Sequence, residues 1–249
     1  MLYGRSDATS IPYHLSLMAT RSIEGAVVAV MGASGGLGSS IVRLLADRGA
    51  VLVLAGPHAD RLQAVADEVA PATSVIAPCD LRDARCGDVI IDAVSEFGRL
   101  DGLINAAGVV AFGSLLETAD DLIEELFLTN TLGPLWLVKR LTPLLSESKG
   151  FIVNISAVVA EAPLPNMAAY SASKAALTAA DGALTRELRR IGIAVCDARP
   201  PHTETGLANH PISGHAPKLP PGLMPDAVAR VIVESIEAGV TDIPASAFG

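Results

Sequence analysis

Short apolar runs rich in β-branched residues alternate with helix-like stretches along most of the chain. The runs that predict strands cover residues 26–31, 50–55, 73–78, 101–106, 151–156, 193–198 and 241–244. The stretches that predict helices cover residues 37–48, 59–69, 83–97, 119–147, 167–190 and 225–238. Regular alternation of this kind is typical of βαβ units joined by right-handed crossovers. We therefore expect an α/β, three-layer, doubly wound fold, with about seven parallel strands and helices on both faces of the sheet.

The composition agrees with a sheet that is covered on both faces. Half of the 249 residues are hydrophobic, and only 4% are aromatic. A chain of this length can bury one large core. We expect a single domain over residues 25–249, preceded by a polar, unpatterned N-terminal extension at 1–24. The long irregular stretch 200–223 predicts a substrate loop. Several apolar residues would give this loop an apolar inner face, which indicates a modest hydrophobic substrate: Leu207, Ile212, Leu219, Leu223 and Met224.

The charge and the cysteines exclude several kinds of partner. A net charge of −9 argues against a basic face for nucleic acid. No apolar run is long enough to cross a bilayer, and the first residues lack a signal-peptide pattern. Cys79, Cys86 and Cys196 are odd in number and lack metal spacing, which indicates reduced thiols in a cytoplasmic protein. The histidines of the 200–223 stretch have no accompanying ligand framework, so we expect no metal. The expected partner is a small molecule.

A glycine-rich turn, MGASGGLGSS, follows the first predicted strand and precedes the first predicted helix. Its Gly32, Gly36 and Gly38 stand in a G-x-x-x-G-x-G spacing. Glycines let the backbone turn sharply and approach a pyrophosphate, to which the helix N-terminus presents free N–H groups. A glycine turn alone is also common as plain structure. Its place between a strand and an amphipathic helix favours a Rossmann-like, dinucleotide-binding domain.

Six motifs follow one another along the chain: the glycine turn, CDL at 79–81, NAAG at 105–108, Asn130 within LTNTLG, YSASK at 170–174 and PPHTET at 200–205. By these motifs and their order, the chain from residue 25 to about 245 resembles the classical short-chain dehydrogenase/reductase family. Departures from the pattern include Met31, which replaces a Thr, and Pro201, which replaces the Gly of P-G-x-V-x-T. The resemblance implies an oxidoreductase that uses NAD(P) and forms a homodimer or homotetramer.

The resemblance also implies which residues contact the dinucleotide. Asp80 would hold the adenine amino group, NAAG would flank the cofactor, and PPHTET would pack on the nicotinamide. The predicted cofactor-binding residues are Gly32, Ser34, Gly36, Leu37, Gly38, His58, Asp80, Leu81, Asn105, Ala106, Gly108, Tyr170, Lys174, Pro200, Thr203 and Thr205.

The end of the second predicted strand bears on the choice between NADP and NAD. A carboxylate there would accept from the ribose 2′-OH and repel a 2′-phosphate, but Gly56 occupies that position. His58 and Arg61 could supply positive charge from the next turn, although a solvated helix start would carry the same residues. We expect NADP in preference to NAD, with both open.

Tyr170 and Lys174 stand one helical turn apart in YSASK. Hydride addition to a carbonyl leaves an alkoxide that must gain a proton, and the resemblance assigns that proton to Tyr170. The positive charge of Lys174 would favour the phenolate, and Lys174 would also bind the nicotinamide ribose. Asn130 would complete a proton relay with Lys174, although a plain helix kink is the alternative. The predicted catalytic residues are therefore Tyr170, Lys174 and Asn130.

The family's usual serine is missing from its place thirteen residues before the Tyr, where this chain has Ala157. Ser156 stands one residue too early, and on a regular strand it points to the opposite face. A local bulge could bring Ser156 into place. Another donor could substitute instead: Asn154, His202, Thr203 or a water. The loss of one oxyanion donor typically costs about 10²–10³ in rate, so the enzyme could also work slowly without one.

The sequence thus predicts an NAD(P)-dependent oxidoreductase that interconverts a secondary alcohol and a ketone by hydride transfer, with Tyr170 as general acid or base. The alternative is a catalytically impaired NAD(P)-binding protein with a structural or sensing role, because Ala157 replaces the usual serine. A third reading is a sugar-nucleotide epimerase of the family's extended branch, which the short chain and the glycine spacing disfavour.

Overall fold

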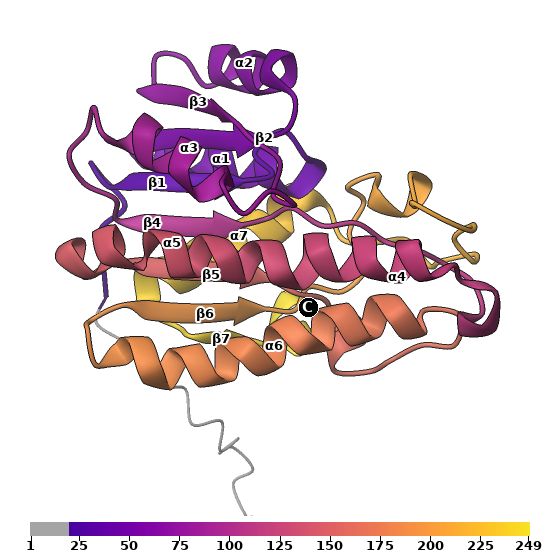
Figure 1. Cartoon of the computed structure of the whole chain (residues 1–249). Helices are drawn as coiled ribbons and strands as arrows, with labels where there is room; N and C mark the ends of the chain where they lie inside the picture. The colour runs from indigo at the N-terminus through magenta and orange to yellow at the C-terminus, as the bar shows by residue number, and fades with distance from the viewer. Residues whose placement is uncertain (1–19) are drawn as a thin grey trace, which may run out of the picture.

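A seven-stranded parallel sheet forms the centre of the computed structural model, which describes residues 20–249 (Figure 1). The strand order is β3-β2-β1-β4-β5-β6-β7, so the chain reverses its direction of travel across the sheet between β1 and β4. Each predicted strand is present, within one residue at either end. The strands are β1 Val27–Met31, β2 Val51–Gly56, β3 Ser74–Pro78, β4 Gly102–Asn105, β5 Phe151–Ile155, β6 Ala194–Ala198 and β7 Asp242–Ile243.

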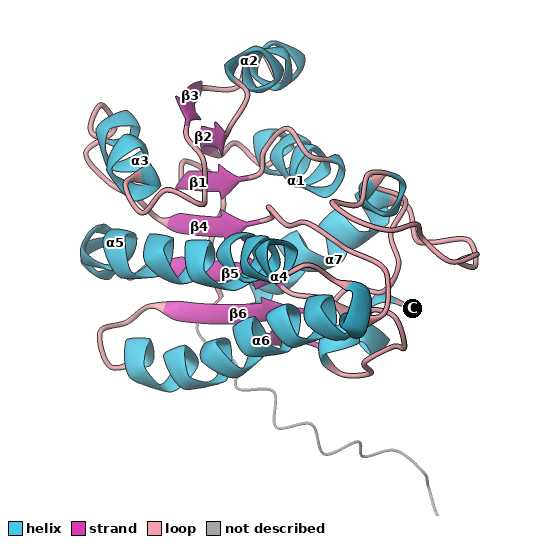
Figure 2. Cartoon of the chain, turned by 45° about the vertical axis from the view of Figure 1, so that its right-hand side comes forward, coloured by secondary structure: helices cyan, strands magenta, loops and turns pink. Residues whose placement is uncertain are grey.

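Helices cover both faces of the sheet, which confirms the predicted doubly wound fold (Figure 2). The helices α1, α2 and α7 pack on one face, and α3, α5 and α6 pack on the other. Their bounds are α1 Gly36–Asp47, α2 Ala59–Glu68, α3 Cys86–Val94, α4 Asp120–Phe127, α5 Gly133–Ser148, α6 Ala168–Arg189 and α7 Pro225–Ala238.

The strands are apolar throughout because both of their faces are buried. In β1, Val28 and Val30 pack toward α1 and α7, whereas Val27, Ala29 and Met31 pack toward α3 and α5. All five side chains are almost completely buried. Near-continuous apolar strands are what a parallel sheet with two covered faces requires.

The single helix predicted over 119–147 is interrupted. A π-helical turn, Leu128–Leu132, separates α4 from α5, and Asn130 lies at its centre. A π turn adds one residue to the helical repeat and often marks a functional site. Pro134 follows in the first turn of α5 and has no N–H, so a carbonyl of the preceding π turn lacks that helical partner.

Residues 20–24 are part of the domain. Ile23 is 1% exposed and packs into the core beneath α1 and α7, and the Arg21 amide donates to the Glu237 carbonyl at 3.1 Å. The remainder of the predicted extension, residues 1–19, lies outside the described part of the chain. Within residues 20–249, the helices are too short or too polar for any of them to span a bilayer.

Candidate active site

A cavity of about 860 Å³ opens at the carboxyl ends of the strands. Its walls include Met31 at the end of β1, Ala106 after β4, Ile155 at the end of β5 and Pro200 after β6. In an open parallel sheet, ligands bind at this edge, beside the point where the strand order reverses. The volume also lies in the range of about 300–1,000 Å³ that is usual for small-molecule sites.

The glycine turn forms one wall of this cavity and leaves no room for side chains. Gly32 has a φ of +83°, and a Cβ there would lie 2.7 Å from the Ala107 amide nitrogen. A Cβ on Gly36 would lie 2.5 Å from the Thr205 carbonyl oxygen. The first turn of α1 begins here without a side-chain cap. The turn therefore presents backbone and a helix N-terminus, which is a favourable surface for an anion.

Most of the predicted dinucleotide contacts line the cavity. Gly38 and Asn105 do not. Gly38 packs against the Gly32 carbonyl and so allows α1 to start close to the turn. The Asn105 amide is 1% exposed and donates to the Asn154 Oδ1 at 2.6 Å, which joins β4 to β5. The predicted residues that do line the cavity are Gly32, Ser34, Gly36, Leu37, His58, Asp80, Leu81, Ala106, Gly108, Tyr170, Lys174, Pro200, Thr203 and Thr205.

We call the part of the cavity lined by Ser34, Gly36, His58 and Asp80 the dinucleotide end. Charged groups gather there: Arg82 pairs with Asp80 at 2.7 Å and with Glu125 at 3.2 Å. The hydrogen bonds from Arg82 hold the pKa of Asp80 below its usual value, so Asp80 is ionised at neutral pH. Asp80 is the residue predicted to bind the adenine amino group, but both of its carboxylate oxygens also accept hydrogen bonds from Arg82.

Tyr170 and Lys174 lie one turn apart on α6, and both line the cavity. They are 7% and 4% exposed. Burial raises the pKa of the Tyr170 phenol, because the phenolate would lose its hydration. Burial lowers the pKa of Lys174 to about 8, and the negative charge of Asp197 opposes this shift. The Lys174 Nζ donates to the Ile155 carbonyl at 2.9 Å, which fixes its position beside β5.

Asn130 is fully buried behind the cavity wall. Its Oδ1 accepts from the Val109 amide at 2.9 Å, and its Nδ2 donates to the Val109 carbonyl at 2.9 Å and to the Ser173 Oγ at 3.1 Å. A Cβ on Gly108 would lie 3.2 Å from both the Asn130 Oδ1 and the Lys174 Nζ. The π turn therefore brings Asn130 next to Lys174, although Asn130 itself does not line the cavity.

The hydroxyl of Ser156 is directed away from Tyr170. It donates to the Asp197 Oδ1 at 2.7 Å and accepts from the Thr178 Oγ1 at 3.0 Å. Thr178 lies eight residues after Tyr170 on α6, which is about 12 Å along the helix axis. Ala157 follows with an extended backbone (φ −170°, ψ 160°) and lines the cavity in the serine's place. Both residues follow the end of β5 at Ile155 and line the cavity, but the Ser156 hydroxyl bonds to Asp197 and Thr178.

Two other candidate donors already have partners. The Asn154 Nδ2 donates to the Asp181 Oδ1 at 2.5 Å, and Asn154 does not line the cavity. The Thr203 hydroxyl donates to the Pro201 carbonyl at 2.9 Å. His202 lines the cavity, and its Nε2 lies 3.5 Å from a Glu204 carboxylate oxygen. Of the protein groups that the sequence suggested as substitutes, His202 is the one left with an uncommitted ring nitrogen.

Thr129 is a cavity residue that the sequence did not indicate. It is 8% exposed, it lines the cavity, and its hydroxyl has no hydrogen-bond partner among the described residues. A buried hydroxyl without a partner is unfavourable. The Thr129 hydroxyl oxygen is itself enclosed, so a polar ligand in the cavity would gain a hydrogen bond to it only after a local movement of the wall.

Arg199 is a second residue that sequence patterns did not indicate. Its guanidinium contacts carboxylates from three elements: Glu161 after β5, Asp197 in β6 and Asp242 in β7. Arg199 is 8% exposed and directly precedes Pro200. Arg199 therefore connects Glu161, in the segment between β5 and α6, to Asp242 in the edge strand β7.

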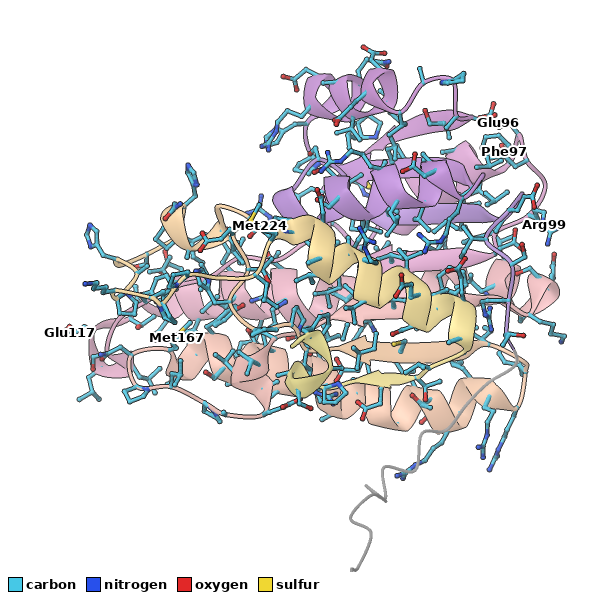
Figure 3. The ribbon with its side chains drawn as sticks, turned by 180° about the vertical axis from the view of Figure 1, so that it is seen from behind. Glu96, Phe97, Arg99, Glu117, Met167 and Met224 are labelled. Carbon is cyan, nitrogen blue, oxygen red and sulfur yellow. The ribbon has the colours of Figure 1, made fainter. Side chains whose placement is uncertain are left out.

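The predicted substrate loop is largely irregular and lines the cavity at residues 200–203, 205–208, 210 and 219. Four of its five predicted inward apolar residues are at least partly covered or line the cavity, but Met224 is 66% exposed at the start of α7 (Figure 3). The prediction is wrong for Met224, because the turn into α7 directs this side chain to solvent. The three cysteines are free, and the described residues hold no cluster of ligands suited to a metal ion.

Residues 26–213, the greater part of the chain, match the family described as short chain dehydrogenase. The chain belongs to this family. A Bos taurus relative, dehydrogenase/reductase SDR family member 7B, is 32% identical over 218 residues, which cover 84% of this chain and 66% of that relative.

Solved structures agree with the family assignment. A dehydrogenase/reductase from Sinorhizobium meliloti 1021 is 31% identical, with a TM-score of 0.80 and coverage of 91% of this chain and 97% of that chain. A short chain dehydrogenase from Burkholderia cenocepacia J2315, solved in complex with NADP, is 25% identical, with a TM-score of 0.78 and coverage of 90% and 89%. The predicted family, oxidoreductase class and fold are thus confirmed.

Proposed function

We propose that this short-chain dehydrogenase is an NAD(P)-dependent oxidoreductase that interconverts a secondary alcohol and a ketone. The observation that carries the proposal is that Tyr170 and Lys174 line the same cavity as Gly32 and Gly36. Hydride transfer to a carbonyl requires a proton donor close to the bound dinucleotide. This cavity would hold the dinucleotide at the glycine turn and presents Tyr170 as the proton donor.

The residues at the dinucleotide end fit NAD(P). The uncapped start of α1 suits a pyrophosphate, and the glycine turn keeps side chains away from it. Asp80 would accept from the adenine amino group, and the Thr129 hydroxyl would gain a partner after a local movement of the wall. When bound, the nicotinamide supplies or accepts the hydride. The NADP complex of the Burkholderia cenocepacia relative supports this choice of ligand.

NADP is favoured over NAD by the residues around the end of β2. Gly56 presents no carboxylate that would repel a 2′-phosphate. Arg61 lines the cavity and donates through its Nη2 to the Ser34 carbonyl at 3.2 Å. The guanidinium is thus held beside the glycine turn, and His58 lines the same corner.

In the direction of ketone reduction, the carbonyl carbon gains one hydride and the oxygen gains the Tyr170 proton. The products are the secondary alcohol and the oxidised dinucleotide, so atoms and electrons balance. Burial keeps the Tyr170 phenol protonated at neutral pH, but its raised pKa also makes it a weaker acid, so proton donation depends on a nearby positive charge. Lys174 stabilises the phenolate that remains, and Asn130 beside it completes the relay that restores the proton.

A catalytically impaired NAD(P)-binding protein is the second candidate. Two observations favour it: Ala157 offers no hydroxyl, and the Ser156 hydroxyl is bound to Asp197. Both candidates bind the same ligand, so only turnover separates them. The homodimer or homotetramer and the cytoplasmic location that the sequence suggested stay predictions.

The deciding experiment compares the wild-type chain with Tyr170→Phe. NADPH and NADH binding is titrated by fluorescence, and cofactor oxidation is then followed with a panel of ketones. We expect Tyr170→Phe to slow turnover by about 10²–10⁴-fold and to leave cofactor affinity nearly unchanged. Tight cofactor binding without turnover on any ketone, and without a change in Tyr170→Phe, would establish the binding protein instead.

A further inference from the structure

The Tyr170 end of the cavity lies in an apolar cluster that is separate from the two cores of the sheet. Val110, Phe112, Val159 and Met167 are buried around Tyr170, and all four line the cavity. Met167 directly precedes α6 (Figure 3). We call this part of the cavity the apolar chamber. It is built from segments that follow β4 and β5, with the substrate loop packed against them.

Main-chain hydrogen bonds join these segments. The Ile212 amide donates to the Val110 carbonyl at 2.9 Å, and the Phe112 amide donates to the Ser213 carbonyl at 3.0 Å. The Gly113 amide donates to the Asn166 carbonyl at 2.8 Å. The walls of the chamber are therefore held in place before any substrate enters, which lowers the cost of binding.

Formal charges are concentrated elsewhere in the cavity. Of the described residues that line it, Asp80, Arg82 and Glu125 pair with one another, and Arg61 is held at the glycine turn. Lys174 is the remaining charged group, and its Nζ is bound to the Ile155 carbonyl. The nearest titratable groups of the substrate loop, His202 and His210, have contacts to Glu204 and to the Gly206 carbonyl. A charged substrate would find no dedicated counter-ion in the chamber.

Apolar side chains continue to the mouth of the cavity. Leu164, between β5 and α6, is 48% exposed, and Leu207, in the substrate loop, is 37% exposed. Both line the cavity. A ligand that extends from Tyr170 to the surface would cover these two side chains and gain from the burial of apolar area.

We propose that the substrate is an uncharged, apolar carbonyl compound or the corresponding secondary alcohol, with a hydrocarbon part that reaches Leu164 and Leu207. The inference rests on the proposed function of the same site. A carboxylate or phosphate on the hydrocarbon part is selected against, most strongly close to the carbonyl, where it would be transferred from water into the apolar chamber without a partner. Chain length adds affinity as methylenes become buried.

The first experiment compares ketones that differ in length and charge. With NADPH, we expect kcat/KM to rise from butan-2-one to decan-2-one by up to roughly fourfold for each methylene that becomes buried. The keto acid 9-oxodecanoate, a charged counterpart of decan-2-one, should react several-fold more slowly, because its carboxylate would lie at the partly exposed mouth beside Leu164 and Leu207 without a cation. Equal or faster reaction of the keto acid, or no gain with length, would overturn the proposal.

Variants of Leu164 and Leu207, at the mouth of the cavity, test whether these side chains cause the dependence of kcat/KM on chain length. Leu164→Ser and Leu207→Ser should lower kcat/KM for decan-2-one several-fold more than kcat/KM for butan-2-one. Leu164→Lys should raise kcat/KM for 9-oxodecanoate, because it supplies the missing counter-ion. Leu116→Ser is the matched control, since Leu116 is 95% exposed and does not line the cavity. A Leu116→Ser effect as large as the other two would contradict the assignment.

Ligand binding separates a failure of this proposal from a failure of the proposed function. Binding of decan-2-one and 9-oxodecanoate to the NADPH-loaded protein is measured from the change in NADPH fluorescence. Tighter binding of the ketone without turnover would sustain the apolar site and refute the oxidoreductase. Turnover that depends on Tyr170 but prefers the keto acid would refute the apolar substrate alone.

Discussion

At the dinucleotide end of the cavity, the glycine turn presents backbone beside charged side chains; at the Tyr170 end, apolar side chains make the surface. Gly32 and Gly36 leave no room for side chains at their positions in the first region, and the start of α1 offers N–H groups. Apolar side chains surround Tyr170 in the second region. The three glycines of the family motif are present where the surface is backbone, although Met31 replaces the Thr before them. The departure at Ala157 lies where side chains decide the chemistry. Recognition of a common ligand and the choice of a particular reaction thus rest on different parts of the chain.

The largest expected effect tests the side-chain end. Ala157→Ser should raise kcat for ketone reduction by up to about 10²–10³-fold, if the site accepts the hydroxyl that most family members carry. Cofactor affinity should not change. Steady-state kinetics and a fluorescence titration check both expectations. Ser156→Ala is the control: its hydroxyl is bound to Asp197, so its loss should leave kcat unchanged. A collapse of kcat in Ser156→Ala would show that Ser156 reaches the substrate after all.

The next effect concerns the dinucleotide end. Arg61→Ala should weaken NADPH binding by about tenfold, the effect of losing about 1.4 kcal/mol of charge-assisted contact with a 2′-phosphate. NADH binding should stay the same, because NADH lacks that phosphate. Fluorescence titration with both cofactors gives the ratio directly. Equal weakening of NADPH and NADH binding would show that Arg61 does not contact the 2′-phosphate.

Thr129 offers a smaller test at the same end. Thr129→Val keeps the side-chain shape and removes the hydroxyl that lacks a protein partner, so the cofactor-free protein should keep its Tm. Cofactor affinity should fall about two- to tenfold, as for one lost hydrogen bond. Thr131→Val gives the contrasting control, because the Thr131 hydroxyl donates to the Ser173 carbonyl at 2.8 Å and its loss should lower Tm. Unchanged affinity in Thr129→Val would place this hydroxyl away from the ligand.

The smallest expected effect concerns a buried polar cluster. In this cluster, side-chain hydrogen bonds link Asn105 in β4, Asn154 in β5 and Asp181 in α6. Asp181 is 1% exposed, and desolvation together with the charge of Asp197 raises its pKa well above the usual value, while Arg199 opposes the shift. The unfolded chain releases this proton near pH ~4, whereas the folded chain keeps it, so rising pH removes stability.

Asp181→Asn does not titrate and can still bind Asn154, so it should be more stable than the wild type at neutral pH. We expect a gain on the order of 2–4 °C in Tm, which corresponds to about 1 kcal/mol in a chain of this size. The difference should shrink as the pH falls toward 4. Thermal unfolding across pH 4–8 measures it, and a gap that grows on acidification would reverse the sign of the argument.

The sequence alone predicted every strand and the cavity's main residues, since both depend on local patterns. Apolar periodicity located the sheet, and the glycine turn and YSASK located the two ends of the cavity. Strand alternation also predicted that the Ser156 hydroxyl would be directed away from the serine's place, and it bonds to Asp197 and Thr178.

Other features depend on neighbours that are distant in the sequence. The unsatisfied hydroxyl of Thr129 is visible only once the π turn has placed it against the cavity. Arg199 forms ion pairs with Asp197 and Asp242, which lie 2 and 43 residues away in the sequence. The local sequence around Arg199 does not predict these pairs. Met224 was misplaced because an apolar side chain at a helix start can face either way.

The joints between the segments of the apolar chamber are made by amides and carbonyls, so they do not depend on which side chains the segments carry. Val110 could be exchanged for Ile, or Phe112 for Leu, with the pairing to Ile212 and Ser213 intact. A scaffold of this kind can be retargeted to new ketones one position at a time. The main-chain hydrogen bonds would stay the same while the side chains that line the apolar chamber changed.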